Sequence, residues 1–171
     1  YRHPRRRVST PADRRRRVAL ALGAAEYLLG RPVRTVLDIG CGEGFWRSPL
    51  LALRPRIRYT GVDPSAYAVS RFGARRAIRH GRVDRLDAAG VRGPYDLVVC
   101  ADVLHYLPPA ELAGDLAGIA RRTGGLAYLP TVTTADDVDG DVRGIRPPTA
   151  ARFRADAHRA GLAPLGNDCY V

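Results

Sequence analysis

The segment from Thr35 to Gly44 constrains the fold of this chain more than any other. It reads TVLDIGCGEG, so an apolar run leads into an acidic residue and then into three glycines at alternate positions. This pattern predicts a buried strand that ends in a tight turn, because glycine accepts positive φ values and lets a ligand lie against bare main chain. Open α/β sheets bind their ligands beyond the carboxyl ends of the strands. The sequence therefore predicts a binding site directly after this strand.

The glycine spacing narrows the kind of ligand. A dinucleotide site uses G-x-G-x-x-G and places the pyrophosphate on the N-terminus of the next helix. Here the third glycine comes one residue early, and an acidic residue precedes the first glycine by two positions. This spacing disfavours an NAD-dependent oxidoreductase. The pattern Asp38-x-Gly40-x-Gly42-x-Gly44 resembles motif I of the class I S-adenosylmethionine-dependent methyltransferases.

Two further segments carry the same resemblance, in the family's order. Residues 61–65, GVDPS, resemble its second-strand acidic motif, and residues 95–107, YDLVVCADVLHYL, resemble its fourth-strand motif. Three blocks in register between residues 33 and 107 are far more specific than one glycine turn. The resemblance implies a Rossmann-like, doubly wound, mostly parallel α/β sheet. It also implies S-adenosylmethionine as the cofactor and S-adenosylhomocysteine as the product.

Length and cysteine content set further limits. The 171 residues predict a single domain over residues 10–171, preceded by a basic arm over residues 1–9. No apolar run approaches the ~20 residues of a membrane span, so no membrane partner is expected. The three cysteines, an odd number at distant spacings, indicate neither a disulfide framework nor a zinc site. We expect a reducing, cytoplasmic setting and no metal.

The net charge of +11 is high enough to raise the question of a nucleic-acid partner. All 28 basic residues are arginine, and they are scattered except for the runs at 5–7 and 14–17. This distribution favours a solvated surface. Nucleic acid is therefore disfavoured as a partner, although an RNA or another acidic partner remains the alternative.

Apolar and turn residues alternate along the chain in the order of parallel βαβ units. The expected strands cover residues 33–39, 57–62, 83–86, 95–100 and 125–129. The expected helices run from a cap at Thr10 to Gly30, from Ser48 to Arg54, from Ser65 to near Gly81 (with Val69 and Phe72 buried), around 112–119, and over 149–160. The end of the chain leaves room only for a very short hairpin about 166–168. The family's sixth and seventh strands are therefore expected in abbreviated form.

The resemblance implies binding roles for several residues of the glycine turn. Gly40, Gly42 and Gly44, with Cys41 between them, let the main chain approach the methionine and ribose portions of the cofactor. Asp38 would face the cationic amino group. Its alternative is a structural carboxylate that accepts local backbone N–H groups, since an unpaired buried carboxylate is costly.

Two later segments would hold the nucleoside. Asp63 is placed to accept hydrogen bonds from both ribose hydroxyls, because a carboxylate offers two acceptor oxygens. Pro64 would pack on the adenine. Asp87, followed by Ala88, would lie near the adenine amino group, and Asp84 is the alternative to Asp87.

The segment after the fourth strand would border the reacting atoms. Ala101, through its carbonyl, and Asp102 would lie beside the sulfonium. Methyl transfer is a direct displacement, so the main tasks are alignment and the exclusion of water. His105 is the candidate catalytic base for an acceptor that must lose a proton. The alternative for His105 is a packing residue that shapes the site.

The expected acceptor is a small molecule. Methyltransferases of nucleobase amines carry an Asp/Asn-Pro-Pro-aromatic block that residues 102–105 lack, and Cys100 follows valine where a pyrimidine-carbon enzyme needs proline. The first helix and the loop 131–148 are expected to cover the acceptor pocket, which is either open or closed by a second copy in a homodimer. The alternatives are an RNA or protein methyltransferase that uses the arginine-rich N-terminal segment, and a non-catalytic domain that keeps the fold.

Overall fold

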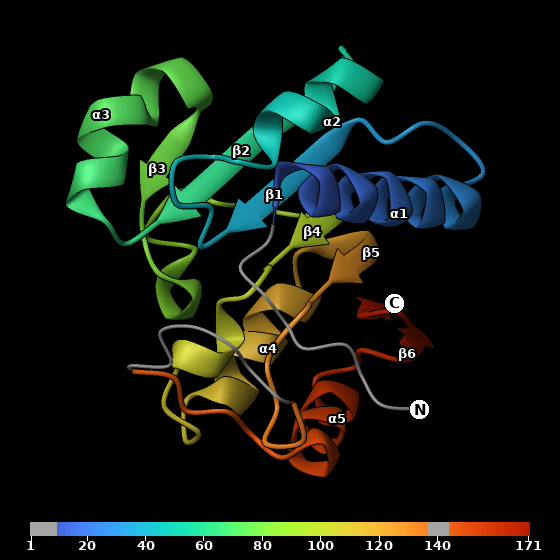
Figure 1. Cartoon of the computed structure of the whole chain (residues 1–171), viewed down its shortest axis with the longest axis vertical. Coiled ribbons are helices and arrows are strands. Elements are labelled where there is room, and N and C mark those ends of the chain that lie inside the picture. Colours follow the sequence, from blue (N-terminus) through green and yellow to red (C-terminus); the bar gives the residue numbers. More distant parts are fainter. Residues whose placement is uncertain (1–9, 137–143) are drawn as a thin grey trace.

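A seven-stranded sheet with helices on both faces forms the centre of the chain (Figure 1). The computed structural model describes residues 10–136 and 144–171. The strands are β1 Thr35–Ile39, β2 Arg58–Asp63, β3 Ile78–His80, β4 Tyr95–Val99, β5 Thr123–Tyr128, β6 Pro164–Gly166 and β7 Cys169–Tyr170. The helices are α1 Pro11–Leu29, α2 Arg47–Leu53, α3 Ala66–Arg76, α4 Leu112–Ala120 and α5 Ala150–Arg159. Two short 3-10 helices, η1 Val83–Arg85 and η2 Leu104–Tyr106, complete the described elements.

The strand order is β3-β2-β1-β4-β5-β7-β6. Strands β1 to β5 pair in parallel, and β7 runs antiparallel to both of its neighbours, β5 and β6. The order reverses between β1 and β4, and ligands of open α/β sheets bind beyond the carboxyl ends of the strands at such a point. The predicted fold class is confirmed, including the short C-terminal hairpin.

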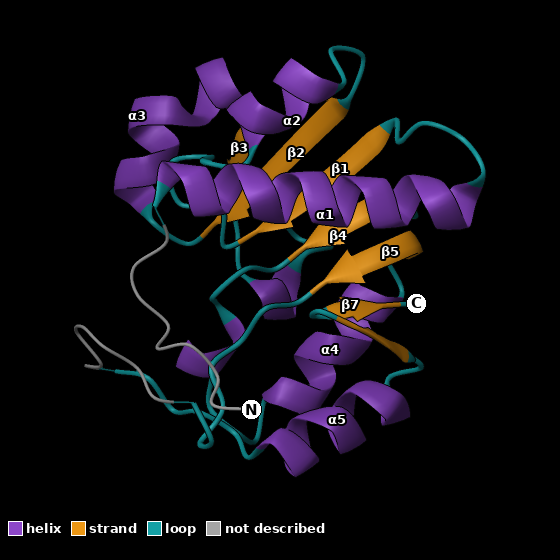
Figure 2. Cartoon of the chain, turned by 45° about the vertical axis from the view of Figure 1, so that its right-hand side comes forward, coloured by secondary structure: helices purple, strands orange, loops and turns teal. Residues whose placement is uncertain are grey.

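Strands β1, β2, β4, β5 and β7 contribute side chains to two separate cores, one on each face of the sheet. Leu97 and Val99 of β4 pack beneath α1 and α2, whereas Val98 packs on the other face with α4 and α5. This alternation follows from the two-residue period of a strand, and Figure 2 shows α1 lying across one face while α4 and α5 lie on the other. Among the helices of residues 10–136 and 144–171, none has the length and apolar character needed to cross a bilayer.

The helix starts predicted from capping residues are largely confirmed. Thr10 forms a capping box with Asp13 at the start of α1, and Gly30 ends that helix in the left-handed conformation. The side chains of Ser65 and Thr149 accept N–H groups in the first turns of α3 and α5. Polar caps are local signals, since the hydrogen bond is made within the same turn. For this reason they could be identified without knowledge of the tertiary fold.

Three predictions about the elements are wrong. Ser48 lies inside α2, which begins at Arg47 without a side-chain cap. The third strand is Ile78–His80, because these residues pair with Gly61–Asp63, and residues 83–85 form η1 instead. Helix α3 therefore ends at Arg76, with Ala77 in the left-handed conformation. The strand signal was missed because Arg79 and His80 are exposed on this edge strand and make no apolar run.

The buried side of α3 also differs from the expectation. Ala68 and Gly73 are the buried residues, while Val69 and Phe72 are only half-buried. The backbone carbonyl of Ile78 would lie 3.1 Å from a Cβ at Gly73, so the helix approaches β3 closely at this position. Small residues therefore face the sheet, and the larger side chains lie along the margin of the contact.

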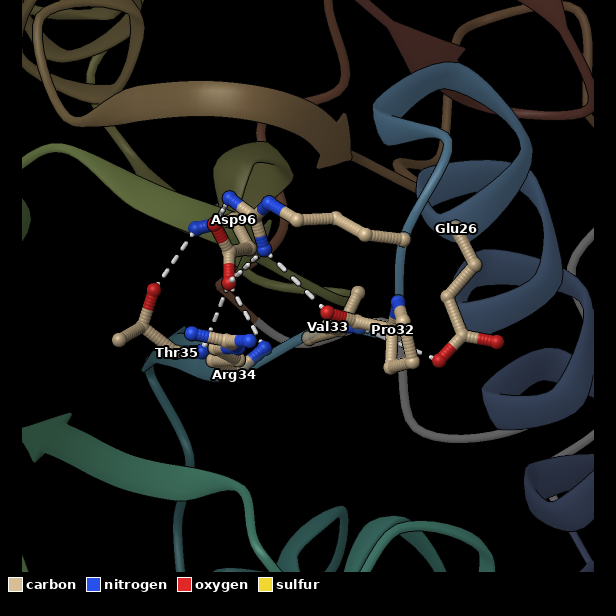
Figure 3. A network of polar contacts seen from close by, with 7 residues as sticks. Glu26, Pro32, Val33, Arg34, Thr35 and Asp96 are labelled. Carbon is tan, nitrogen blue, oxygen red and sulfur yellow. Dashed lines mark hydrogen bonds and ion pairs between the residues drawn. The ribbon is translucent and has the colours of Figure 1, made fainter.

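Asp96 connects the starts of β1 and β4 to the end of α1 (Figure 3). One carboxylate oxygen accepts the backbone N–H groups of Arg34 at 2.7 Å and Thr35 at 3.0 Å, and the other accepts Arg31 Nη2 at 2.7 Å. The hydrogen bonds from Arg31 and the two backbone amides hold the pKa of Asp96 down at about 2, against the opposing effect of burial. This network holds the base of the two central strands, at the end opposite to the glycine turn.

Candidate active site

The turn after β1 requires glycine at its first position for two reasons. Gly40, Gly42 and Gly44 have φ values of 67°, 54° and 77°, a region that side chains disfavour. A Cβ at Gly40 would also lie 2.4 Å from Cγ2 of Val103. At Gly42 a Cβ would meet nothing within 4 Å, so the main chain there faces open space. The turn thus presents bare backbone, as the glycine spacing predicted.

The carboxyl end of β2 holds this turn in place. Asp63 accepts the backbone N–H of Gly42 at 2.7 Å through one oxygen and the N–H of Ser65 at 2.8 Å through the other. The carbonyl of Val62 accepts the N–H groups of Gly40 and Cys41 at 2.8 and 3.2 Å. Each carboxylate oxygen of Asp63 retains a further lone pair, because a carboxylate has about four acceptor sites. Asp63 therefore both shapes the turn and keeps acceptor capacity beside it.

Asp38 is buried beneath the same turn. It is 2% exposed, and its Oδ2 accepts a 2.6 Å hydrogen bond from the hydroxyl of Tyr59. Burial raises the pKa of Asp38 to about 7, and the charge of Asp63 adds to this increase, while the hydrogen bond from Tyr59 opposes it. Near neutral pH this carboxyl can therefore lose or gain a proton when a charged group binds next to it.

A pocket of about 150 Å³ lies above Asp38; we call it the Asp38 pocket. Its lining includes Arg14 and Arg17 from α1, together with Asp38, Ala101 and Asp102 from the ends of β1 and β4. Arg17 donates to Asp102 at 2.7 Å, and Asp102 has a φ of 59°. The pocket thus combines two carboxylates with two guanidinium groups. That combination suits a ligand that carries both an ammonium and a carboxylate group.

A second pocket, of about 470 Å³, lies on the other side of Gly40; we call it the Val103 pocket. Its lining includes Gly40, Pro64, Val83 and Val103 around the strand ends and Arg146 from the segment before α5. Because Gly40 lines both pockets, they meet over its main chain. The combined site is elongated, with a charged end at Asp38 and a more apolar end at Val103 and Pro64.

Not every predicted cofactor residue lies at these two pockets. Asp87 lines a different pocket beside α4, its side chain is 85% exposed, and it accepts from Arg122 at 2.7 Å. Asp84 lines that same pocket and pairs with Arg82, while Ala88 is exposed. The structure therefore brings Asp38, Gly40, Cys41, Pro64 and Ala101 to the two pockets. Asp63 lies beside them through its hydrogen bond with Gly42, and the 84–88 segment lies apart.

His105 is buried, with 4% of its surface exposed. Its Nδ1 accepts the backbone N–H of Val132 at 3.2 Å, and its carbonyl accepts the N–H of Arg146 at 2.6 Å. An Nδ1 that accepts a hydrogen bond carries no proton, so the neutral ring is protonated at Nε2. In this tautomer Nε2 is a donor. The structure thus ties the His105 ring to the backbone of Val132, and its role as a base stays a prediction.

Arg14, Arg17 and Val103 were not singled out by the sequence reasoning. The two arginines are three residues apart and so lie on one side of α1, which was the available signal. A cluster at the positive end of a helix dipole needs solvent or an anion, and Arg17 has Asp102 as its partner. Val103 carried no comparable signal, because its contact with Gly40 depends on the path of the chain after β4.

Two predicted segments lie partly or wholly outside the described residues. The basic arm, residues 1–9, is one of them. The other is the predicted cover, residues 131–148, of which 137–143 fall outside. The described part of that segment brings Gly144 and Arg146 to the Val103 pocket.

The strand order, the glycine turn and the two pockets that meet over it define a Rossmann-like fold of the methyltransferase type. A family model described as a methyltransferase domain matches residues 37–126. The chain belongs to this family, as its three motifs predicted. Its cofactor, as a family, is S-adenosylmethionine, and structural neighbours have been crystallised with S-adenosylmethionine or S-adenosylhomocysteine bound.

Individual relatives extend this result. The chain is 33% identical over 105 residues to the ubiquinone biosynthesis O-methyltransferase of Methylobacterium sp. (strain 4-46), an alignment that covers 57% of this chain and 41% of that protein. It is 27% identical over 134 residues to the magnesium-protoporphyrin O-methyltransferase of Synechocystis sp. (strain ATCC 27184 / PCC 6803 / Kazusa), covering 75% of this chain and 58% of the relative. The chain thus spans about half the length of these relatives.

A solved structure agrees on the fold. Magnesium protoporphyrin IX methyltransferase from Synechocystis PCC 6803, with S-adenosylhomocysteine bound, matches with a TM-score of 0.64 at 18% identity. The match covers 95% of this chain and 83% of that chain. At this identity the likeness shows a shared fold.

Proposed function

We propose that this chain transfers a methyl group from S-adenosylmethionine to an oxygen atom of a small-molecule acceptor. The observation that carries the proposal is the meeting of the Asp38 and Val103 pockets over the main chain of Gly40. One end offers opposite charges for an amino-acid group, and the other offers an apolar wall for a nucleoside. The cofactor has these two ends in the same order.

The residues at the charged end match the amino-acid part of the cofactor. Asp38 would accept from the ammonium group, and Arg14 and Arg17 would face the carboxylate. Arg14 lies with its guanidinium 4.4 Å from the centre of the Phe45 ring, which holds it beside the pocket. Charge-assisted hydrogen bonds of this kind are about twice as strong as neutral ones.

The nucleoside would lie across the ends of β2 and β4. Asp63 keeps lone pairs for the ribose hydroxyls while it holds Gly42, and Pro64 and Val103 offer apolar faces to the adenine. In this arrangement the adenine contacts come from residues 64, 83 and 103. Asp87, which pairs with Arg122 in another pocket, is not needed for them.

When bound, the cofactor supplies an activated methyl group, so the chain's own residues have to align the acceptor and exclude water. Ala101 and Asp102 lie where β4 ends, between the charged pocket and the segment of His105. His105 fastens this segment to Val132 and Arg146, and we assign it a positioning role. The oxygen acceptor is inferred from the two relatives, whose names describe O-methyltransferases.

Calorimetry and an acceptor screen test this proposal. We expect S-adenosylhomocysteine to bind with a dissociation constant in the micromolar range and NAD not to bind. A library of small phenols, carboxylic acids and amines, incubated with radiolabelled methyl donor, should give label on an oxygen acceptor. Cofactor binding without turnover on any acceptor would favour the non-catalytic alternative. Label on RNA, with affinity that falls steeply as salt rises, would favour a nucleic-acid substrate.

A further inference from the structure

A third pocket, of about 660 Å³, lies between residues 82–87 and helix α4. Helix α4 packs against η1 on the α4/α5 side of the sheet, where Figure 1 shows it below β4 and β5. The pocket, which we call the Asp115 pocket, shares Arg82 and Glu111 with the Val103 pocket. Nη2 of Arg82 and Oε2 of Glu111 are 3.8 Å apart, and this pair separates the Asp115 pocket from the proposed cofactor site.

Glycine residues keep the helix side of this pocket open. Gly114 and Gly118 lie one turn apart in α4, and each costs about 1 kcal/mol relative to alanine in a helix interior. A Cβ at Gly114 would meet nothing within 4 Å, and one at Gly118 would meet only ordinary contacts. Packing therefore does not require glycine at either position, and bare helix backbone lines the pocket.

The lining of this pocket also contains the buried carboxyl of Asp115. Asp115 is 2% exposed, and its Oδ2 has no hydrogen-bond partner among the described residues. Burial raises the pKa of Asp115 to about 6, with Asp84 and Glu111 adding to the increase and Arg82 opposing it. A buried polar atom without a partner is destabilising, and buried polar groups in proteins are nearly always satisfied. The unpaired oxygen indicates a ligand that donates a hydrogen bond.

The charges around the pocket narrow the chemistry of that ligand. Four carboxylates and four guanidinium groups line it: Asp84, Asp87, Glu111, Asp115, Arg82, Arg85, Arg121 and Arg122. Most of them already pair with one another, as Arg82 and Arg85 do with Asp84 and Arg122 does with Asp87. Asp115 and Arg121 remain, because within residues 10–136 and 144–171 no carboxylate pairs with Arg121. A ligand with one positive and one negative group would satisfy both.

We propose that the Asp115 pocket binds a small zwitterion, whose ammonium group donates to Asp115 and whose acidic group accepts from Arg121. Arg121 reaches back along the helix, so that its Nη2 lies 3.9 Å from the Cβ position of Gly118. Asp115 and Gly118 are three residues apart, a rise of about 4.5 Å along the helix. The two charges of the ligand are therefore close together, as in a short-chain amino acid. The described residues hold no cluster of metal-binding side chains, which disfavours a metal ion as the positive group.

Isothermal titration with amino acids of increasing chain length tests the proposal. The probes are glycine, β-alanine, 4-aminobutyrate and 5-aminopentanoate, with propylamine and propionate as single-charge controls. The protein is first saturated with S-adenosylhomocysteine, so that the Asp38 pocket cannot take up the probe. If it does not bind that compound, the same titrations are run on the free protein and on Asp38→Asn. The outcome thus does not depend on the proposed function.

We expect saturable binding of at least one chain length and at least about tenfold weaker binding of both single-charge controls. Asp115→Asn and Arg121→Gln should each weaken binding by about tenfold or more. Gly114→Leu should abolish it by filling the pocket, without changing any charge. Arg75→Gln, at an exposed arginine of α3, is the matched control and should leave binding unchanged.

Three results would overturn the proposal. One is the absence of saturable binding of every probe to the wild-type protein at about 10 mM. Another is binding of propylamine as tight as that of the best amino acid, which would show that the ligand needs no acidic group. The third is binding that survives Asp115→Asn and Gly114→Leu, which would place the probe elsewhere on the molecule.

Discussion

Arg17 and Asp102 are 85 positions apart in the sequence and are joined by a 2.7 Å hydrogen bond at the rim of the Asp38 pocket. The bond ties the first helix to the end of β4. Asp102 has a φ of 59°, a conformation that non-glycine residues seldom adopt, and its backbone N–H also donates to the carbonyl of Pro130. Contacts on two sides therefore hold a strained residue beside the proposed methyl-transfer site, which is typical of functional positions.

Arg17→Ala is expected to weaken the binding of S-adenosylhomocysteine by about tenfold or more, since a charge-assisted hydrogen bond is worth about 1.5–3 kcal/mol. The variant removes both the proposed contact to the cofactor carboxylate and the partner of Asp102. Calorimetry measures the change. Arg16→Ala is the matched control, because the side chain of Arg16 is 84% exposed and lies one position away. Equal affinities of the two variants would contradict the role assigned to Arg17.

Cofactor affinity is expected to rise with pH between about 6 and 8. The pKa of Asp38 is raised to about 7 by burial, so its carboxyl is largely protonated below this pH. An ammonium group binds the ionised form, and proton loss from Asp38 therefore favours binding. Calorimetric titrations at several pH values measure the slope. A pH-independent affinity would contradict the contact between Asp38 and the ammonium group.

Tyr59→Phe provides a second test of the same group. The hydroxyl of Tyr59 donates to Asp38 and lowers its pKa, in opposition to burial. Without it, the midpoint of the pH dependence should move to higher pH. In the free protein, the raised pKa of Asp38 stabilises the fold below pH ~4. This contribution is lost as the pH rises through the folded-state pKa of about 7. Asp38→Asn should remove both pH dependences.

Asp63→Ala should weaken cofactor affinity by about 1–3 kcal/mol, the usual cost of unpaired buried polar groups. The variant frees the backbone N–H groups of Gly42 and Ser65 as well as the ribose hydroxyls. Asp87→Ala is a control, because Asp87 lies in the Asp115 pocket and pairs with Arg122, and neither residue lines the two cofactor pockets. An unchanged calorimetric affinity for Asp63→Ala would refute the ribose assignment.

His105→Asn separates a positioning role from a catalytic one. The amide oxygen of asparagine can accept the N–H of Val132 in place of Nδ1, but it cannot act as a base. If His105 positions its segment, the asparagine variant should keep kcat close to wild type while His105→Ala lowers it. If His105 is a base, both variants should lose about 10²–10⁴ in kcat and change the pH profile. Steady-state kinetics with the acceptor found in the screen distinguish the two.

Asp96→Ala is expected to lower the free energy of unfolding at pH 7 by about 2 kcal/mol, because it leaves two backbone N–H groups and Arg31 without their acceptor. The pKa of Asp96 is lowered to about 2 by Arg31 and the backbone amides. Its contribution is therefore fully present above pH ~4 and is lost as the pH falls from there through the folded pKa of about 2. Urea unfolding at pH 7 and pH 3 measures it. Glu43→Gln, 4.0 Å from Arg76 on the surface, should change stability by less than about 0.5 kcal/mol.

Local signals in the sequence were sufficient for the central strands, the glycine turn and the main caps. The alternating glycines indicated a backbone with positive φ at Gly40, Gly42 and Gly44. The helix starts are marked by capping side chains, those of Thr10, Ser65 and Thr149. Each of these requirements is met within a few residues of chain. The order of the motifs then identified the family, whose model matches the same segment.

The partners of the charged groups could be found only in the folded chain. The sequence does not reveal that Tyr59 donates to Asp38, that Arg17 binds Asp102, or that Asp87 pairs with Arg122. It also does not show that Asp115 is buried, with its Oδ2 lacking a partner among residues 10–136 and 144–171. Burial and through-space distance determine these pairings, and both depend on how elements far apart in the sequence pack together. The sequence thus determined the fold and the place of the site, and the tertiary structure decided which side chains meet there and how they are charged.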